Sequence, residues 1–167
     1  MDRDAVADEM AIRNLGAAYA DACGRLCPED VAALFAPDGA MGMTGGKTAR
    51  GDKILRNFQI VLGRYGFLVQ TLHSGLIVLD GPDRAGGDAA RGRWWMSEVL
   101  KPRDSGEYRM NLGFYEDAYV RLDGQWRIAS RMFTLRLSTP LPHGAVEGPE
   151  PAFAALPLAG LSARGTG

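Results

Sequence analysis

Alternating polar and apolar positions dominate the second half of the chain and predict a long β-hairpin. Polar residues alternate loosely with apolar or aromatic ones over Arg109–Leu122, and the alternation resumes over Gln125–Phe133. The Asp123-Gly124 pair between these segments is typical of a two-residue turn. Because an isolated hairpin of this length is not stable in water, other elements must cover one of its faces.

The first half of the chain shows helical spacing of apolar residues in three places. A first helix is predicted over Ala5–Cys23, and a short second helix begins at Pro28, where proline suits the first turn. Asp52 is a predicted N-cap for a third helix that ends near Leu62. Between the second and third helices, the glycine-rich segment Ala36–Arg50 predicts a turn, a short edge strand and a loop.

Two further strands are predicted before the hairpin, over Phe67–Asp80 and Arg93–Leu100, which are rich in β-branched, leucine and aromatic residues. Helices followed by several antiparallel strands indicate an α+β domain with the helices on one face of a bent sheet. After Leu137 the chain becomes rich in proline, glycine and alanine. We therefore predict a single domain over residues 1–137 and an irregular C-terminal tail over residues 138–167.

Composition and charge narrow the class of protein. The 167 residues are 46% hydrophobic, with 19 basic and 20 acidic side chains, which suits one compact domain with a substantial core. The balanced charge, without a basic cluster, argues against a nucleic-acid partner. No apolar run approaches the roughly 20 residues of a membrane span, and the N-terminus is too polar for a signal peptide. We expect a cytoplasmic protein without a membrane partner.

Short motifs with known chemistry are incomplete in this chain. The segment Gly45-Gly46-Lys47-Thr48 resembles the end of a phosphate loop, but the first glycine of that motif is missing. His73 and His143 lie far apart without carboxylates at ligand spacing, and Cys23 and Cys27 lack partners for a zinc site. We expect no metal and no cofactor, and we interpret the cysteines as buried thiols.

Three polar side chains on predicted core-facing elements form a candidate site. His73 lies in an apolar strand, Tyr19 on the buried stripe of the first helix, and Arg131 in the apolar part of the last strand. Each alone also fits a structural role, as a backbone-bonded histidine, a packed tyrosine ring or an arginine that reaches solvent. Together they predict one pocket that all three side chains enter.

The order of the elements resembles the SnoaL-like branch of the nuclear-transport-factor-2-like superfamily. The resemblance covers roughly Ala5–Arg131 and is carried by LFAPDG after the second helix, HSG in a strand, and the terminal YEDAYVRLDGQWRIASR. It implies a cone-shaped barrel, in which about three N-terminal helices wrap a strongly curved, mostly antiparallel sheet around a deep pocket. Members of the superfamily include dehydratases, isomerases, polyketide cyclases and dehydrochlorinases, most of which work without metal or cofactor.

Within this branch, the chain is most similar to the scytalone-dehydratase-like and lindane-dehydrochlorinase-like enzymes. The resemblance implies that His73 is the general base and that Arg131 is the pocket arginine of the dehydrochlorinases. The family's aspartate, which orients the histidine, falls on Gly24 in this chain. Asp21, or Asp117 on the facing strand, is a candidate replacement.

The implied function is that of a cofactor-free lyase or isomerase, of the dehydratase or cyclase type, acting on a small hydrophobic substrate that is aromatic or polyketide-derived. His73, Arg131, Tyr19 and Asp21 form the predicted catalytic set. The predicted substrate-binding residues are Trp94, Met96, Tyr115, Phe58, Asn111 and Phe114. The alternative is a non-catalytic module of the same fold that binds a small ligand or serves in an assembly.

The outer face of the predicted curved sheet has an implication for the oligomeric state. Outward-facing apolar residues on the last two strands and the leucine-containing tail both need cover. We therefore predict a homodimer or a homotrimer.

Overall fold

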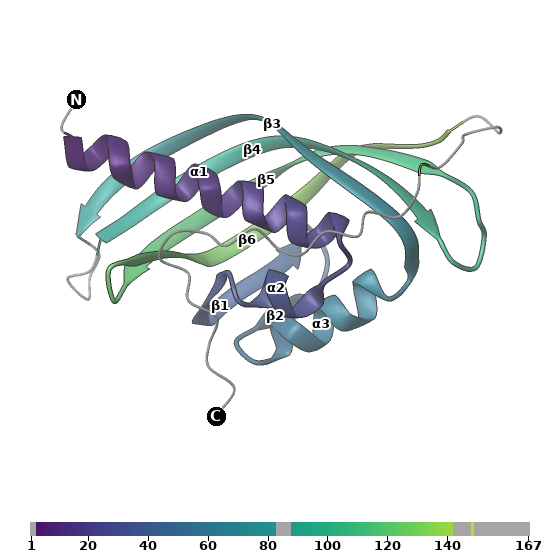
Figure 1. Cartoon of the computed structure of the whole chain (residues 1–167), viewed down its shortest axis with the longest axis horizontal. Helices are drawn as coiled ribbons and strands as arrows, with labels where there is room; N and C mark the ends of the chain where they lie inside the picture. Colours follow the sequence, from purple (N-terminus) through teal and green to yellow (C-terminus); the bar gives the residue numbers. More distant parts are fainter. Residues whose placement is uncertain (1–2, 83–87, 142–147, 149–167) are drawn as a thin grey trace.

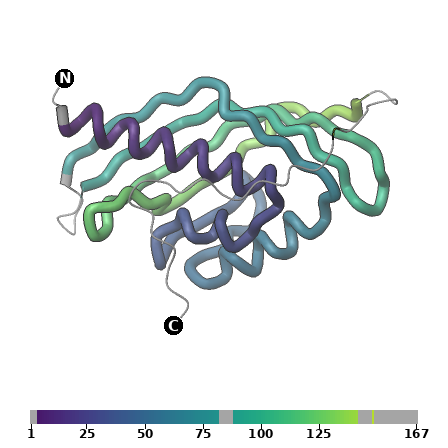
Figure 2. The backbone as a smooth tube through the Cα atoms, viewed as in Figure 1, coloured from purple at the N-terminus to yellow at the C-terminus, as the bar shows by residue number. Residues whose placement is uncertain are grey.

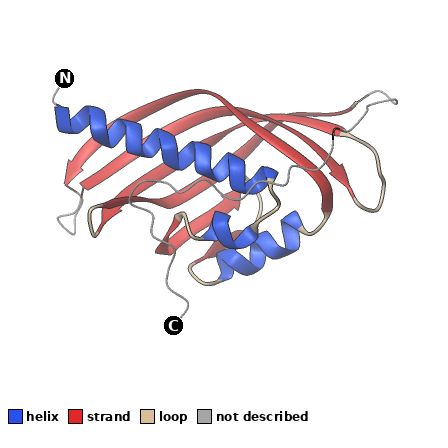
Figure 3. Ribbon diagram, viewed as in Figure 1, coloured by secondary structure: helices blue, strands red, loops and turns tan. Residues whose placement is uncertain are grey.

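The computed structural model describes residues 3–82, 88–141 and 148, and its elements confirm the predicted α+β class (Figures 1 and 3). The helices of this described part are α1 (Arg3–Gly24), α2 (Pro28–Ala32) and α3 (Lys53–Leu62). Its strands are β1 (Phe35–Met43), β2 (Thr48–Arg50), β3 (Tyr65–Pro82), β4 (Asp88–Pro102), β5 (Arg109–Leu122) and β6 (Gln125–Pro140). None of these helices is long and apolar enough to cross a membrane.

One six-stranded sheet runs in the order β2-β1-β6-β5-β4-β3. Neighbouring strands are antiparallel except β1 and β6, which pair in parallel. The long strands curl without closing into a complete barrel, and α1 crosses one face of the sheet while α2 and α3 lie together near one end (Figures 1 and 2). This arrangement is the cone-like, mostly antiparallel fold that the sequence predicts.

The β5–β6 hairpin forms at the predicted turn. Leu122 pairs with Gln125, and both turn residues have positive φ angles, 50° for Asp123 and 78° for Gly124. Two consecutive positive φ angles are the signature of a type I′ turn, whose twist matches that of the flanking strands. The turn fixes the register of the hairpin, so that alternate β5 residues from Gly113 to Tyr119 face the core.

The segment Ala36–Arg50 differs from its prediction. Phe35–Met43 forms β1, a strand inside the sheet, and the edge position belongs to the short β2. Pro37 and Gly39 weaken the strand signal of this segment in the sequence, because both residues are depleted in strand interiors. A register shift in the first half of β1 accommodates them.

The end of β6 also differs from the predicted domain boundary. The strand continues to Pro140 and so passes Leu137, the last residue of the predicted domain. Most of the predicted tail, including His143, lies outside the described residues. The division between domain and tail therefore stays a prediction.

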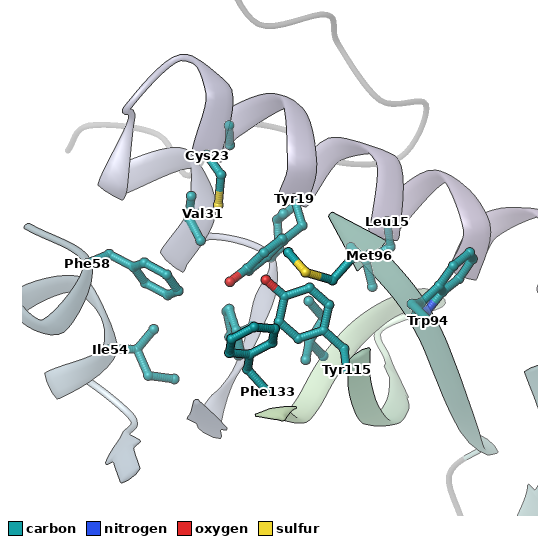
Figure 4. Close-up of a cluster of buried hydrophobic side chains, with 14 of the residues drawn as sticks. Leu15, Tyr19, Cys23, Val31, Ile54, Phe58, Trp94, Met96, Tyr115 and Phe133 are labelled. Atoms are coloured by element: carbon teal, nitrogen blue, oxygen red, sulfur yellow. The ribbon is translucent and has the colours of Figure 1, made fainter. Parts of the chain in front are cut away.

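The hydrophobic core lies between the helices and the inner face of the sheet. Tyr19 of α1 stands at its centre and meets the rings of Phe35, Phe58 and Tyr115 edge-on, at centroid distances of 6.4, 6.1 and 5.7 Å (Figure 4). Edge-to-face contacts of this kind add to the stabilisation from area burial. They hold α1 and α3 in place over the sheet.

The outer face of the sheet carries exposed apolar side chains. Leu76 is 74% exposed, and Val78 and Trp95 are about half exposed. Trp95 contacts the ring of Phe114 on the neighbouring strand at a centroid distance of 5.1 Å. The predicted homodimer or homotrimer would cover exposed apolar residues on the last two strands, such as Leu137, which is 48% exposed, and the oligomeric state stays a prediction.

Gly75 tests the packing between β3 and β4. A Cβ atom at Gly75 would overlap the indole ring of Trp94, which is buried and donates a hydrogen bond to Tyr119. Gly75→Ala should therefore lower the free energy of unfolding by about 1–3 kcal/mol, as overpacking commonly does, and urea denaturation measures it. The control is Gly66→Ala on the same strand, where the new atom would lie 3.8 Å from the Arg103 side chain. Equal losses in both variants would contradict the packing argument.

Candidate functional site

A cavity of about 270 Å³ lies between α1, α3 and the inner face of the sheet. Its apolar walls include Phe58 and Leu62 from α3, Leu68 from β3 and Phe133 from β6. The polar residues that line it are Tyr19, Cys23, Lys47, Asn57, Tyr65, Gln70, Glu98, Asn111 and Tyr115. A largely apolar cavity with a few converging polar groups is the usual form of a small-molecule site.

The strongest polar feature of the cavity is the Glu98 carboxylate. Asn111 Nδ2 donates to Glu98 Oε1 at 2.8 Å, and Gln70 Nε2 donates to Glu98 Oε2 at 3.2 Å. The sheet register explains this contact, because Gln70 of β3 and Asn111 of β5 are each the direct pairing partner of Glu98 on β4. Directly paired residues share one face of a sheet. We call Gln70, Glu98 and Asn111 the polar row.

Gln70 links the polar row to the aromatic part of the cavity. Its Nε2 also donates to the Tyr115 hydroxyl at 2.9 Å. This orientation follows from charge, because the amide oxygen would be repelled by the Glu98 carboxylate. It leaves Gln70 Oε1 buried and without a hydrogen-bond partner in the described part of the chain. A buried acceptor without a partner costs stability, so the polar row is better explained by function than by stability.

Tyrosine hydroxyl groups face the same cavity. The hydroxyls of Tyr19 and Tyr115 point toward one another (Figure 4), and burial raises the pKa of both well above the ordinary value. Burial, followed by the neighbouring charge of Glu98, also raises the pKa of Tyr65. All three hydroxyls therefore keep their protons at neutral pH and are able to donate hydrogen bonds.

Arg131 is fully buried behind two of these tyrosines rather than at the cavity surface. Its guanidinium carbon lies 4.1 Å from the ring centroid of Tyr19 and 4.4 Å from that of Tyr115. It donates two hydrogen bonds to Asp117, from Nε at 2.9 Å and from Nη2 at 2.6 Å. Burial opposes the positive charge, but the attraction of Asp117 and its hydrogen bonds outweigh burial, so the pKa of Arg131 lies well above its usual value. Its Nη1 is buried without a hydrogen-bond partner among the described residues.

A short hydrogen-bond chain supports Asp117 from the other side. The Tyr119 hydroxyl donates to Asp117, and Trp94 Nε1 donates to the Tyr119 oxygen at 2.9 Å. All four residues of this chain, including Arg131, are buried. Asp117 is therefore the partner of Arg131 and not, as one alternative had it, of a histidine.

The predicted substrate-binding residues divide into two groups. Tyr115, Phe58 and Asn111 line the cavity. Trp94 and Met96 belong to the buried core outside the cavity lining, and Phe114 packs against Trp95 beside the exposed outer face. These last three do not line this cavity, and their contact with a substrate stays a prediction.

His73 does not share a pocket with Arg131 and Tyr19. It is exposed, and its Nε2 lies 2.8 Å from Ser97 Oγ. Strand alternation explains this orientation, because Leu72 packs against the core and the next residue faces outward. The pairing of β3 with β4 is irregular between Leu72 and Gly75, so His73 has no direct pairing partner on β4. The predicted position of the general base is therefore wrong.

Asp21 does not complete a dyad with His73. It is exposed and accepts a hydrogen bond from Arg25 at 2.8 Å, within one turn of α1. Gly24, at the position of the family's aspartate, lies near the Leu68 carbonyl oxygen and brings no side chain to the cavity. The carboxylate that lines the cavity is instead that of Glu98, which the sequence reasoning missed.

Cys23 lines the cavity as a protonated thiol. Burial raises its pKa to about 12, so it is a weak nucleophile and a poor metal ligand at neutral pH. In the described part of the chain, no three histidine, cysteine or acidic side chains gather in a way that could hold a metal ion.

Comparison with known proteins identifies the family and the fold. A family model described as SnoaL-like domain matches residues 4–132. Among solved structures, a hexachlorocyclohexane dehydrochlorinase (LinA) of type 2 aligns with a TM-score of 0.76 and 18% identity, over 90% of this chain and 99% of that chain. LinA-type3 from Novosphingobium barchaimii LL02 aligns with a TM-score of 0.76 and 18% identity, over 89% of this chain and 100% of that chain.

A third solved structure has a higher sequence identity. Rv3472 of Mycobacterium tuberculosis, a protein of unknown function, aligns with a TM-score of 0.68 and 25% identity, over 80% of this chain and 74% of that chain. No curated protein matches the sequence. At 18% identity, the likeness to the dehydrochlorinases shows a shared fold.

Arg131 should contribute mainly to stability. Arg131→Met removes the partner of a buried carboxylate, and we expect the free energy of unfolding to fall by about 3–5 kcal/mol, as measured by urea denaturation. Arg136→Met is the matched control, because Arg136 lies exposed on the same strand. An Arg131→Met protein as stable as the control would show that the pair with Asp117 contributes little.

The Cys23 thiol should resist alkylation. With a pKa of about 12, about one molecule in ten thousand carries the thiolate at pH 8. In a Cys27→Ser background, iodoacetamide should label Cys23 very slowly at pH 8, faster as the pH rises toward 12, and readily in urea. Mass spectrometry gives the rates, and rapid labelling of the folded protein at pH 8 would contradict the buried position.

Proposed function

Because the chain belongs to the SnoaL-like domain family, we propose that it is a lyase or isomerase that carries out acid–base chemistry on a small hydrophobic substrate in this cavity. The reaction uses side chains of the protein alone. The observation that carries the proposal is the Glu98 carboxylate, which two neutral amides hold at the wall of a mainly apolar cavity.

Glu98 takes the place that the sequence assigns to His73. A carboxylate that is fixed by hydrogen bonds and faces a bound substrate can remove a proton from a carbon next to a carbonyl or a leaving group. Proton transfer leaves a neutral carboxylic acid, which an apolar cavity tolerates better than a charge. The two amides also orient the carboxylate, so its reactive oxygen is positioned before the substrate binds.

The tyrosines supply the complementary donors. Hydroxyls that stay protonated can hydrogen-bond to the negative oxygen of an enolate or to a departing oxygen. Tyr65 is the first candidate, because it lines the cavity and lies near enough to Glu98 for that charge to raise its pKa. Tyr115 is the second, and its hydroxyl is already held by Gln70.

The structural neighbours support elimination chemistry as a class. Two of them are named as dehydrochlorinases, and an elimination of that kind begins with the loss of a proton from carbon. The substrate of these dehydrochlorinases is not assigned to this chain, because the substrate of this chain depends on the residues that line its own cavity. The proposal is therefore limited to a reaction class and a small hydrophobic substrate.

One observation favours the alternative of a non-catalytic ligand-binding module. Gly24 replaces the aspartate of the family's dyad, and His73 is exposed on the outer side of its strand. A cavity that has lost this dyad retains the ability to bind an apolar ligand. The two candidates differ in what Glu98 does.

Glu98→Gln separates these two candidates. A panel of small lipophilic ketones, hydroxyketones and alkyl chlorides is first screened by thermal shift, because ligands of the folded state raise its apparent stability. Compounds that bind are then followed for product formation. We expect the variant to bind them and to lose at least about 100-fold in kcat, the usual contribution of a general base.

Glu116→Gln is the matched control for this experiment. Glu116 is an exposed glutamate on β5 that pairs with Arg93 and lies outside the cavity lining, so its loss should leave kcat unchanged. Binding without turnover by the wild-type protein across the panel would favour the binding module. Equal kcat in Glu98→Gln and the wild type would remove Glu98 from the mechanism.

A further inference from the structure

The polar row, as distinct from the tyrosines, offers mainly hydrogen-bond acceptors to the cavity. Gln70 uses its Nε2 on Glu98 and on Tyr115, and Asn111 uses its Nδ2 on Glu98. Each oxygen of the Glu98 carboxylate accepts one of these bonds and has a further lone pair for another donor. Three of the four amide N–H groups of the row, two from Gln70 and one from Asn111, already bond to Glu98 or Tyr115, so a hydrogen atom from a ligand is what the Glu98 oxygens accept next.

The charge at this end of the cavity is negative. Glu98 and Lys47 are the two charged residues among those that line the cavity. Lys47 lies in the exposed loop between β1 and β2, where solvent screens its charge. Arg131 does not offset Glu98 toward the cavity, because it lies behind Tyr19 and is paired with Asp117.

The remaining walls favour an apolar body. Phe58, Leu68 and Phe133 line the cavity with rings and aliphatic carbons, and burial of apolar surface against them supplies the driving force for binding. A second negative charge close to Glu98 would be repelled in such surroundings, because apolar walls screen charge less well than water does.

We propose that the cavity selects an uncharged molecule with an apolar body and a hydroxyl group, and that Glu98 excludes carboxylates. The hydroxyl donates its hydrogen to Glu98, and the polar row holds that end of the ligand. A neutral hydroxyl fits better than an ammonium group, because the ammonium would lose far more hydration on entering a cavity with mainly apolar walls. This inference rests on the function proposed above, since it assigns the substrate class of the same cavity.

Binding of four matched compounds tests this selectivity without any need for turnover. Indane, 5-indanol, indane-5-carboxylate and 5-(aminomethyl)indane share one apolar body and differ in one group. Isothermal titration calorimetry at pH 7 measures each Kd. We expect 5-indanol to bind about tenfold more tightly than indane, as a hydrogen bond to a charged acceptor allows, and the carboxylate to bind at least about tenfold more weakly than 5-indanol.

Three variants assign the preferences to residues. Glu98→Gln keeps the shape and removes the charge, so the penalty against the carboxylate should largely disappear and the advantage of 5-indanol over indane should shrink. Glu116→Gln on the outer face is the matched control and should leave all four Kd values unchanged. Lys47→Gln should also leave the order of the four compounds unchanged.

Several results would overturn the inference. Tightest binding of the carboxylate, lost in Lys47→Gln, would make the exposed lysine the determinant, and tightest binding of the amine would make the site one for cations. Equal binding of all four compounds, or no binding of any, would also reject it. A selective wild-type cavity whose Glu98→Gln variant retains full kcat would reject the proposed mechanism while leaving the selectivity intact, so the two failures are distinguishable.

Discussion

The buried guanidinium of Arg131 is the constraint on which the rest of the structure depends. A charge in a protein interior is tolerated only with a partner of good geometry, and Arg131 donates two hydrogen bonds to Asp117 while it stacks on Tyr19 and Tyr115. These contacts join the β5–β6 hairpin to α1, which is distant from it in sequence. Loss of any one of them would leave a polar group buried without compensation, which favours a single arrangement of helix and sheet.

This constraint also shapes the cavity. The guanidinium of Arg131 stacks on both tyrosine rings, and the hydroxyl groups of these tyrosines point toward one another (Figure 4). Gln70 connects the Tyr115 hydroxyl to Glu98, so the buried pair and the candidate base belong to one network of contacts. Arg131 thus acts on the site through the tyrosines. It does not line the cavity, although the resemblance to the dehydrochlorinases implies direct contact with substrate.

The secondary structure could be predicted largely from local patterns, because apolar periodicity, the Asp123-Gly124 turn and the proline at the start of α2 act over a few residues. The interior strand β1 could not, because its proline and glycine suppress the strand signal while pairing with β6 compensates over long range. The site depends on which side of a strand each residue faces. Family resemblance places His73 in the cavity, yet its neighbour Leu72 occupies the inward position. Glu98 lies two residues from Met96 and two from Leu100, which are both buried, so strand alternation places all three side chains on the same face of β4. This spacing was a signal available in the sequence.

The polar row brings a carboxylate to the cavity from a position that the family resemblance does not predict. In this chain, glycine stands at the position of the family's helix aspartate, and the carboxylate that faces the cavity comes instead from the middle of the sheet. This carboxylate is held by two neutral amides and not by an imidazole, so the amides and the apolar walls determine its surroundings. Register makes this arrangement specific, because a shift of one residue between β3 and β4 would turn Gln70 away from Glu98. The long strands that fix this register are therefore as much a part of the site as the side chains they carry.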